Sequence, residues 1–248
     1  MRNFNKEIED NSGRSYFYGF DYDVMHHFMI KALSDHFQKG NLLEMGSFQG
    51  AFTKRLLDLK IFDSISCVEA SSDAVANVDK KIEALVDISN TTFEEFEATS
   101  KYNNIVMTHV LEHLDNPVMV LKKINDELMA DEGILGLICP NANAPSRQIA
   151  VKMGLISHNS AVTPAEDEHG HRITYTLDTL ERDARAAGLD VIARKGIFFK
   201  ALANFQWDLI LKQDGIISPE YLEGCYQLGQ IYPDLCSSIM LVCKKGQK

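Results

Sequence analysis

Two carboxylates and a glycine turn are the first residues in this chain whose types and spacing point to ligand binding. Glu44 and Gly46 follow a short apolar stretch, Gly50 precedes a helical pattern at 52–57, and Glu69 ends the next apolar stretch. Glycines let the backbone turn tightly and approach a ligand. An acidic residue that ends a second strand can accept hydrogen bonds from ribose hydroxyls. Because a carboxylate repels a diphosphate and attracts a cation, the motif favours a ribose-containing ligand with a positive charge.

A dense polar cluster at residues 166–172 is the second candidate site. Imidazole titrates near neutral pH, so His169 or His171 could take a proton from a substrate hydroxyl. The same cluster could be a hydrated loop without a chemical role, or could hold a metal ion; we expect no metal. Arg147 and Arg172 could bind an anionic group of the substrate, although each could equally be a solvated charge.

A third pattern, H-x-x-E-H, is formed by His109, Glu112 and His113 and is typical of some zinc peptidases. That chemistry needs a helix that carries both histidines and a further ligand. Here His109 ends an apolar stretch, and a separate helix is expected to begin after Asn116 and to end at Gly133. The pattern therefore does not favour a peptidase.

The elements that must position these residues alternate along the chain. Short apolar stretches are followed by helical patterns from about residue 41 onward, which predicts an α/β fold with a mostly parallel, doubly wound sheet and helices on both faces. The stretches expected as strands are 42–44, 65–69, 85–88, 105–108, 134–139, 191–193 and 239–243. We expect one domain over 1–248, with an N-terminal helical cap at 1–40. Residues 141–175 break the alternation and are expected to cover the substrate.

Composition excludes several classes of protein. The 248 residues are 45% hydrophobic and 24% charged, which is typical of a globular protein. The net charge of −10 disfavours a nucleic-acid partner. No apolar run reaches the roughly 18 residues that would span a bilayer, so we expect no membrane partner. Five cysteines without a C-x-x-C pair suggest no disulfide framework, and a reducing cytoplasm is the expected location.

The chain resembles the class I S-adenosylmethionine-dependent methyltransferases over about residues 40–200. The resemblance is carried by Glu44-x-Gly46-x-x-x-Gly50, by Glu69, and by the stretch 102–114 that runs through the fourth strand. That last stretch is the most specific and is similar to the group that contains the ubiquinone-type O-methyltransferases. The resemblance implies a Rossmann-like sheet of seven strands, all parallel except the last inserted one.

S-adenosylmethionine is the cofactor that the resemblance implies, with S-adenosylhomocysteine as product. It would be surrounded by Glu44, Gly46, Ser47, Gly50, Glu69, Ala70, Phe93, Glu94 and His109. Glu44 would lie near the ammonium group, and the two glycines and Ser47 would face the methionine part and the ribose. Glu69 would hold the ribose hydroxyls, and Ala70, Phe93 and Glu94 would lie beside the adenine. His109 would stand near the sulfonium and the acceptor.

The function expected from these observations is methyl transfer to a small molecule, at oxygen rather than nitrogen, with a sugar, a phenol or another hydroxylated metabolite as acceptor. His109, His169 and His171 are the candidate bases, and Tyr18, Arg147 and Arg172 are the candidate acceptor contacts. Open alternatives are an N-methyltransferase and a non-catalytic protein that binds S-adenosylmethionine or S-adenosylhomocysteine. A nicotinamide-dependent oxidoreductase and a protein or RNA methyltransferase are weaker alternatives. A monomer or a homodimer is expected.

Overall fold

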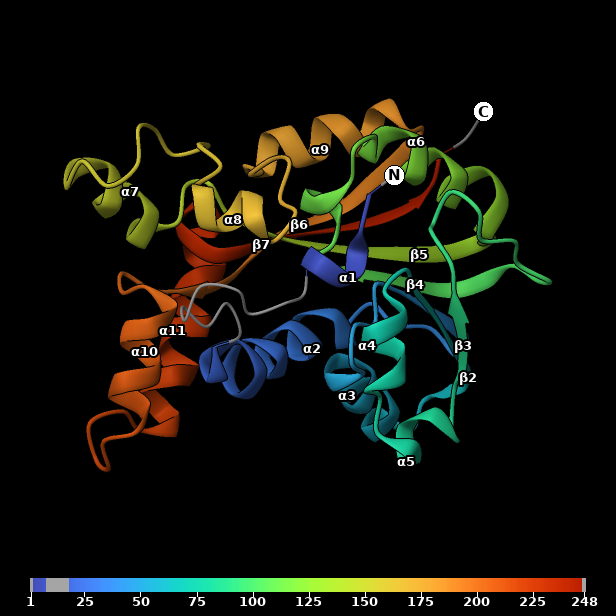
Figure 1. Cartoon of the computed structure of the whole chain (residues 1–248), viewed down its shortest axis with the longest axis horizontal. Helices are drawn as coiled ribbons and strands as arrows, with labels where there is room; N and C mark the ends of the chain where they lie inside the picture. Colours follow the sequence, from blue (N-terminus) through green and yellow to red (C-terminus); the bar gives the residue numbers. More distant parts are fainter. Residues whose placement is uncertain (1, 8–17, 247–248) are drawn as a thin grey trace.

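A seven-stranded sheet forms the centre of the molecule in the computed structural model, which describes residues 2–7 and 18–246 (Figure 1). The strands are β1 (Gly40–Met45), β2 (Phe62–Glu69), β3 (Asp87–Asn90), β4 (Tyr102–Thr108), β5 (Met129–Pro140), β6 (Leu189–Phe199) and β7 (Cys236–Lys245). Their order is β3-β2-β1-β4-β5-β7-β6, and of these strands only β7 runs antiparallel to the others. The predicted doubly wound, mostly parallel sheet is confirmed, and each expected stretch overlaps one strand.

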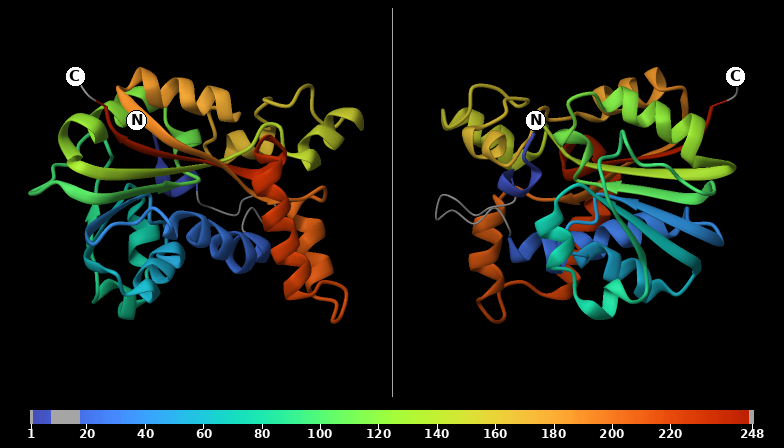
Figure 2. Two further views of the ribbon diagram at one scale, coloured as in Figure 1. Left: turned by 180° about the vertical axis from the view of Figure 1, so that it is seen from behind. Right: turned by 45° about the vertical axis from the view of Figure 1, so that its right-hand side comes forward.

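Helices cover both faces of this sheet (Figures 1 and 2). The α-helices are α1 (Phe4–Glu7), α2 (His26–Ser34), α3 (Ala51–Leu59), α4 (Ser72–Ala76), α5 (Lys80–Glu83), α6 (Pro117–Lys123), α7 (Pro145–Lys152), α8 (Pro164–Glu168), α9 (Leu177–Ala186), α10 (Asn204–Leu211) and α11 (Pro219–Ile231). Short π and 3₁₀ segments are η1 (Asp21–Met25), η2 (Leu111–His113), η3 (Ile124–Leu128) and η4 (Pro233–Leu235). Helices α6 and α9 lie on one face, and α2, α3 and α11 lie on the other.

Two apolar cores, one on each face, hold the layers together. Leu42 packs into the core beneath α2 and α3, whereas Leu43 packs into the core beneath α6 and α9. Successive side chains of a strand point to opposite faces, so one strand serves both cores. Both leucines are fully buried. Burial of each is worth roughly 1.5–3 kcal/mol, and this double coverage is why the central strands are almost continuously apolar.

The helix that begins after Asn116 is shorter than expected. It ends at Leu128 with the π turn η3, and Gly133 lies inside β5 rather than at the helix end. A Cβ at position 133 would lie 2.8 Å from the backbone oxygen of Tyr102, on the neighbouring strand. Gly133 is therefore required by close packing of β4 and β5.

The predicted N-terminal cap and the predicted insert are described to different extents. Of the expected cap at 1–40, residues 1 and 8–17 lie outside the described part, and α2 packs against the sheet through Phe28 and Leu33. Residues 141–175 leave β5 and form α7 and α8 (Figure 1). Among the described residues, no helix has both the length and the apolar character needed to cross a membrane.

Candidate active site

A cavity of about 650 Å³ lies where β1, β2, β4 and β5 end. Ligands of open α/β sheets bind at the carboxyl ends of the strands, and the volume is typical of small-molecule sites. The loops after these strands form the inner wall. The insert 141–175, residues of α1, and the segments at 200–205 and 237–238 complete the wall.

The turn after β1 depends on Gly46. Its φ is 85°, in the left-handed region that favours glycine, and its amide donates to the backbone oxygen of Val68 at 2.8 Å. A Cβ at this position would lie 2.3 Å from Cγ2 of Val110, in the turn after β4. The turn can therefore approach a bound ligand and the β4 loop only with glycine at this position.

Glu69 ends β2 at the cavity wall. Its Oε2 accepts a hydrogen bond from the Phe48 amide at 2.9 Å, and its Oε1 accepts one from the Ser71 amide at 2.8 Å. Burial raises the pKa of Glu69, and these amide donors oppose the rise by stabilising the charge. Each carboxylate oxygen can accept a second bond, so Glu69 can bind a pair of ribose hydroxyls while it fixes the loop.

Glu44 lies behind the cavity wall, with only 1% of its surface exposed. Its Oε2 accepts from Thr53 Oγ1 at 2.6 Å, and burial raises the pKa of Glu44 to about 7. Within the described chain, Glu44 Oε1 and the buried Ser47 Oγ have no hydrogen-bond partner. Unpartnered buried polar atoms are costly, so these two atoms fit the polar end of a ligand bound at the turn.

Six of the nine residues expected at the cofactor line the cavity: Gly46, Ser47, Glu69, Ala70, Phe93 and His109. Glu44 lies behind them. Gly50 starts α3 with a left-handed φ of 82° and faces the side chains of Val78 and Ile82, away from the wall. Glu94 is exposed, and its backbone oxygen accepts a bond from Lys123 Nζ. The structure therefore places Gly50 and Glu94 outside the wall of the cavity.

The three candidate bases all line the cavity. His109 follows β4 with a left-handed φ of 53°, and its Nε2 lies 2.9 Å from Ser238 Oγ. Burial lowers the pKa of His109 to about 3, and it also lowers the pKa of His171 to about 4. His169 Nδ1 lies 3.1 Å from the backbone oxygen of Glu7. His109 and His171 are therefore neutral at pH 7, and the lowered pKa makes each a weaker base than a free imidazole.

The candidate acceptor contacts divide into two groups. Tyr18 and Arg147 line the cavity, whereas Arg172 lies outside its wall. Arg147 Nη1 pairs with Glu166 Oε1 at 2.5 Å, and the guanidinium also donates to the backbone oxygens of Asn159 and Ala161. It thus ties α7 to the rest of the insert. Arg172 pairs with three acidic side chains, those of Asp115, Asp167 and Glu7.

Three buried or partly buried polar residues of the cavity wall, Asp21, Lys200 and Asn204, were not predicted from the sequence. Lys200 donates to Asn204 Oδ1, and Asn204 Nδ2 donates to Asp21 Oδ2 at 2.7 Å. Burial raises the pKa of Asp21 to about 6 and lowers that of Lys200 to about 8. These residues lie far apart in the sequence and lack a common motif. Only the contact between η1 and the start of α10 brings them together.

Glu112 and His113 also line the cavity, although the H-x-x-E-H pattern does not form on one helix. They lie on the short η2 turn, and His109 precedes that turn with its ring directed to Ser238. The side chain that joins Glu112 and His113 is instead His171 of the insert. Two residues of the pattern, Glu112 and His113, therefore do lie at the cavity, but the third residue beside them is His171 and not His109.

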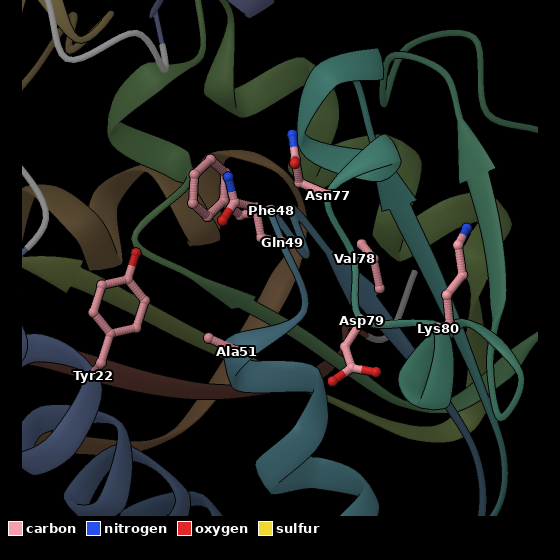
Figure 3. A pocket seen from close by; sticks show the side chains of 8 residues that line it. All are labelled: Tyr22, Phe48, Gln49, Ala51, Asn77, Val78, Asp79 and Lys80. Atoms are coloured by element: carbon pink, nitrogen blue, oxygen red, sulfur yellow. The ribbon is translucent and has the colours of Figure 1, made fainter.

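A smaller, open hollow of about 480 Å³ lies next to the cavity and shares Tyr22, Phe48 and Ala51 with it. Figure 3 shows its lining side chains, with Tyr22 on one side of the start of α3 and Asn77, Asp79 and Lys80 on the other. Phe48 has a left-handed φ of 47°. This conformation is rare for an aromatic residue, and the Glu69 carboxylate holds it in place.

The fold and the cavity together define a Rossmann-like protein with a small-molecule cavity at the carboxyl ends of its strands. Residues 20–194 match the model of the methyltransferase domain family, and the chain belongs to this family. S-adenosylmethionine is therefore its methyl donor. The residues fit this cofactor, because Gly46 leaves room at the turn and Ser47 and Glu69 place polar atoms on the cavity wall.

Solved structures share the fold at low sequence identity. N-methyltransferase NodS from Bradyrhizobium japonicum WM9, solved with S-adenosyl-L-homocysteine, has a TM-score of 0.60 and 11% identity, over 99% of this chain and 100% of that one. A chain of the complex between the Haloferax volcanii Trm112 methyltransferase activator and a methyltransferase has a TM-score of 0.60 and 14% identity, over 92% of each chain. An S-adenosylmethionine-dependent methyltransferase from Clostridium acetobutylicum ATCC 824 has a TM-score of 0.56 and 10% identity, over 92% of this chain and 93% of that one. No curated protein sequence matches this chain.

Proposed function

We propose that this enzyme transfers the methyl group of S-adenosylmethionine to an oxygen atom of a small hydroxylated molecule, such as a sugar or a phenol. The observation that carries the proposal is one cavity of about 650 Å³ in which Gly46 and Glu69 face the same space as His109, His169 and His171. The stretch 102–114, which resembles the ubiquinone-type O-methyltransferases, supports oxygen as the acceptor atom.

On this proposal the β1 and β2 loops bind the cofactor. Glu69 accepts hydrogen bonds from the ribose hydroxyls, and Phe93 and Ala70 lie beside the adenine. Ser47 Oγ and Glu44 Oε1, both buried without a partner in the described chain, receive the polar methionine end. When bound, S-adenosylmethionine supplies a methyl group that its sulfonium has already activated.

The remaining task of the protein is alignment and proton removal. Holding two reactants in line can contribute roughly 7–11 kcal/mol to the barrier reduction. The acceptor hydroxyl must lose its proton as the new bond to carbon forms. We assign that proton to one of the cavity histidines, His109, His169 or His171, whose neutral ring has a nitrogen that can act as a general base.

The insert 141–175 covers the acceptor in this proposal. It contributes α7, α8 and the histidine-bearing loop to the wall, and the Arg147–Glu166 ion pair of 2.5 Å stabilises its shape. Tyr18 from the N-terminal segment faces the same space. Exclusion of water strengthens the electrostatic interactions in the site, so a closed insert favours the reaction over exposure of the sulfonium to solvent.

We further propose a cytoplasmic enzyme that is a monomer or a homodimer. All five cysteines are unpaired, which is typical of a reducing compartment. Size-exclusion chromatography with light scattering measures the oligomeric state.

Two experiments test the proposed function. Calorimetric titration of the purified chain with S-adenosylmethionine and S-adenosylhomocysteine is expected to give micromolar binding of both. Incubation with S-adenosylmethionine and a panel of matched hydroxylated and amino acceptors, followed by mass spectrometry, is expected to give methylated hydroxyl compounds. Methylation of amines alone would establish an N-methyltransferase instead. Cofactor binding without transfer to any acceptor of either kind would favour the non-catalytic alternative.

A further inference from the structure

Three metal-ligating side chains converge at the cavity wall outside the residues assigned to the cofactor. Glu112 and His113 come from η2, immediately after β4, and His171 comes from the insert. One ligand atom from each lies within 4.8 Å of the others. Metal–ligand bonds of about 2.0–2.2 Å hold two ligands of one ion up to about 4.4 Å apart. Small side-chain rotations therefore suffice to bring all three onto a shared ion.

The Glu112 carboxyl group lacks the partners that a buried carboxyl group normally has. It is 1% exposed, and neither of its oxygens has a hydrogen-bond partner within the described residues. Buried carboxyl groups are normally paired, hydrogen-bonded or bound to a metal. A ligand in the space beside Glu112 would supply the partner that its carboxyl group lacks.

The backbone around the three residues is fixed by hydrogen bonds across the cluster. The amides of Arg172 and Ile173 donate to the backbone oxygen of Glu112 at 2.8 and 3.3 Å. The His171 amide donates to the Glu166 oxygen at 2.9 Å. These bonds join the insert to η2 next to the ligating side chains, and such support is what a preorganised ion site requires.

The imidazole rings of the cluster are also oriented. The rings of His113 and His171 lie edge to face, with centroids 4.4 Å apart. A hydrogen bond to the His169 backbone also holds the His113 ring. Metal-binding histidines are usually oriented by a hydrogen bond of the ring outside the metal, and the bond to the His169 backbone orients His113.

We propose that Glu112, His113 and His171 bind one divalent transition-metal ion. Two imidazoles and one carboxylate form the donor set of catalytic zinc sites and of non-haem iron(II) sites. Magnesium, which prefers oxygen ligands, fits less well. Zn²⁺, Co²⁺, Mn²⁺ and Fe²⁺ are therefore the ions to test. Three protein ligands leave at least one coordination position, which the cavity supplies with solvent or with an oxygen of the acceptor.

The role of this ion in catalysis rests on the proposed function. A bound cation lowers the pKa of a coordinated hydroxyl and orients it, which is what transfer to oxygen requires. The hydroxyl proton passes to a neighbouring base, the methyl group moves from sulfur to oxygen, and the sulfonium becomes a neutral thioether. In this arrangement His171 is a metal ligand, so the base that accepts the hydroxyl proton is His109 or His169, both of which line the same cavity.

The test is direct metal binding by the full chain. The protein is stripped with a chelator, titrated with Co²⁺ while its visible absorption is recorded, and loaded in parallel with Zn²⁺ for elemental analysis after desalting. The expected result is one ion per chain, with a Co²⁺ spectrum that shows nitrogen and oxygen ligands. Glu112→Gln and His171→Ala are each expected to weaken binding at least about tenfold, since even outer-shell partners are worth about 10–100-fold.

His158→Ala is the matched control, because His158 is an exposed histidine of the same insert. It is expected to bind the ion as the natural chain does. S-adenosylhomocysteine binding by each variant reports whether the variant is folded. A natural chain that binds S-adenosylhomocysteine but retains no ion overturns the proposal, as does unchanged ion affinity in both ligand variants. An ion bound at these residues without S-adenosylhomocysteine binding would support the metal site and contradict the proposed function.

Discussion

The backbone amide of Phe48 donates to Oε2 of Glu69 at 2.9 Å, so the residue expected to hold the cofactor ribose also holds the glycine turn after β1. Phe48 keeps a left-handed φ of 47° at that point. Backbone strain of this kind is usually found where the surrounding structure enforces it for function. One carboxylate therefore couples the shape of the β1 loop to the ribose site.

Glu69→Ala is expected to weaken S-adenosylhomocysteine binding by more than about tenfold, because a charged acceptor is worth roughly 1.5–3 kcal/mol. Calorimetric titration measures this loss. Glu69→Gln keeps one oxygen acceptor and is expected to bind with an intermediate affinity. An unchanged dissociation constant in Glu69→Ala would remove this residue from the binding site.

Gly46→Ala is expected to destabilise the chain by about 2 kcal/mol or more, because the new Cβ meets Val110 Cγ2 and the backbone stays left-handed. Urea unfolding measures the change. The double variant with Val110→Ala is expected to recover part of the loss, since it removes the clash but not the backbone strain. Strictly additive effects of the two substitutions would contradict the contact.

The raised pKa of Glu44 predicts that the stability of the folded chain depends on pH. Its folded pKa of about 7 lies above the usual value of 4.5, so the folded chain holds this proton more tightly than the unfolded chain does. The contribution is fully present below pH 4.5 and is lost as pH rises to about 7. Urea unfolding as a function of pH is expected to show this fall, and Glu44→Gln is expected to reduce it. An equally steep fall in Glu44→Gln would assign the effect to other groups.

His171→Ala is expected to leave cofactor binding intact and to slow turnover, by about 10²–10⁴-fold if the residue acts as the base. Calorimetry and a methyl-transfer assay with an identified acceptor measure the two effects. Loss of ion binding together with turnover would identify His171 as a metal ligand. Loss of cofactor binding as well would indicate a structural histidine, because its ring packs against His113.

Local patterns were sufficient for the fold. Alternating apolar stretches located all seven strands, because burial on both faces of a parallel sheet leaves a short, continuous apolar run in the sequence. Glu69 and Gly46 were also predictable, since the ends of consecutive parallel strands meet at one edge of the sheet. Both line the cavity. The error at Gly133 arose because glycine can end a helix or permit close strand packing, and only the neighbouring oxygen of Tyr102 decides between them.

The sequence by itself determined the layered sheet and the glycine turn, because these depend on residues close together in the chain, and its resemblance to a known family indicated the class of enzyme. Tertiary structure alone decided that Gly50 packs against Val78 and that Arg172 is engaged by acidic side chains. It also decided that Glu112 meets His171 from a distant loop. Such contacts depend on how loops fold over the sheet edge, and no periodicity in the sequence predicts which distant residues those loops bring together.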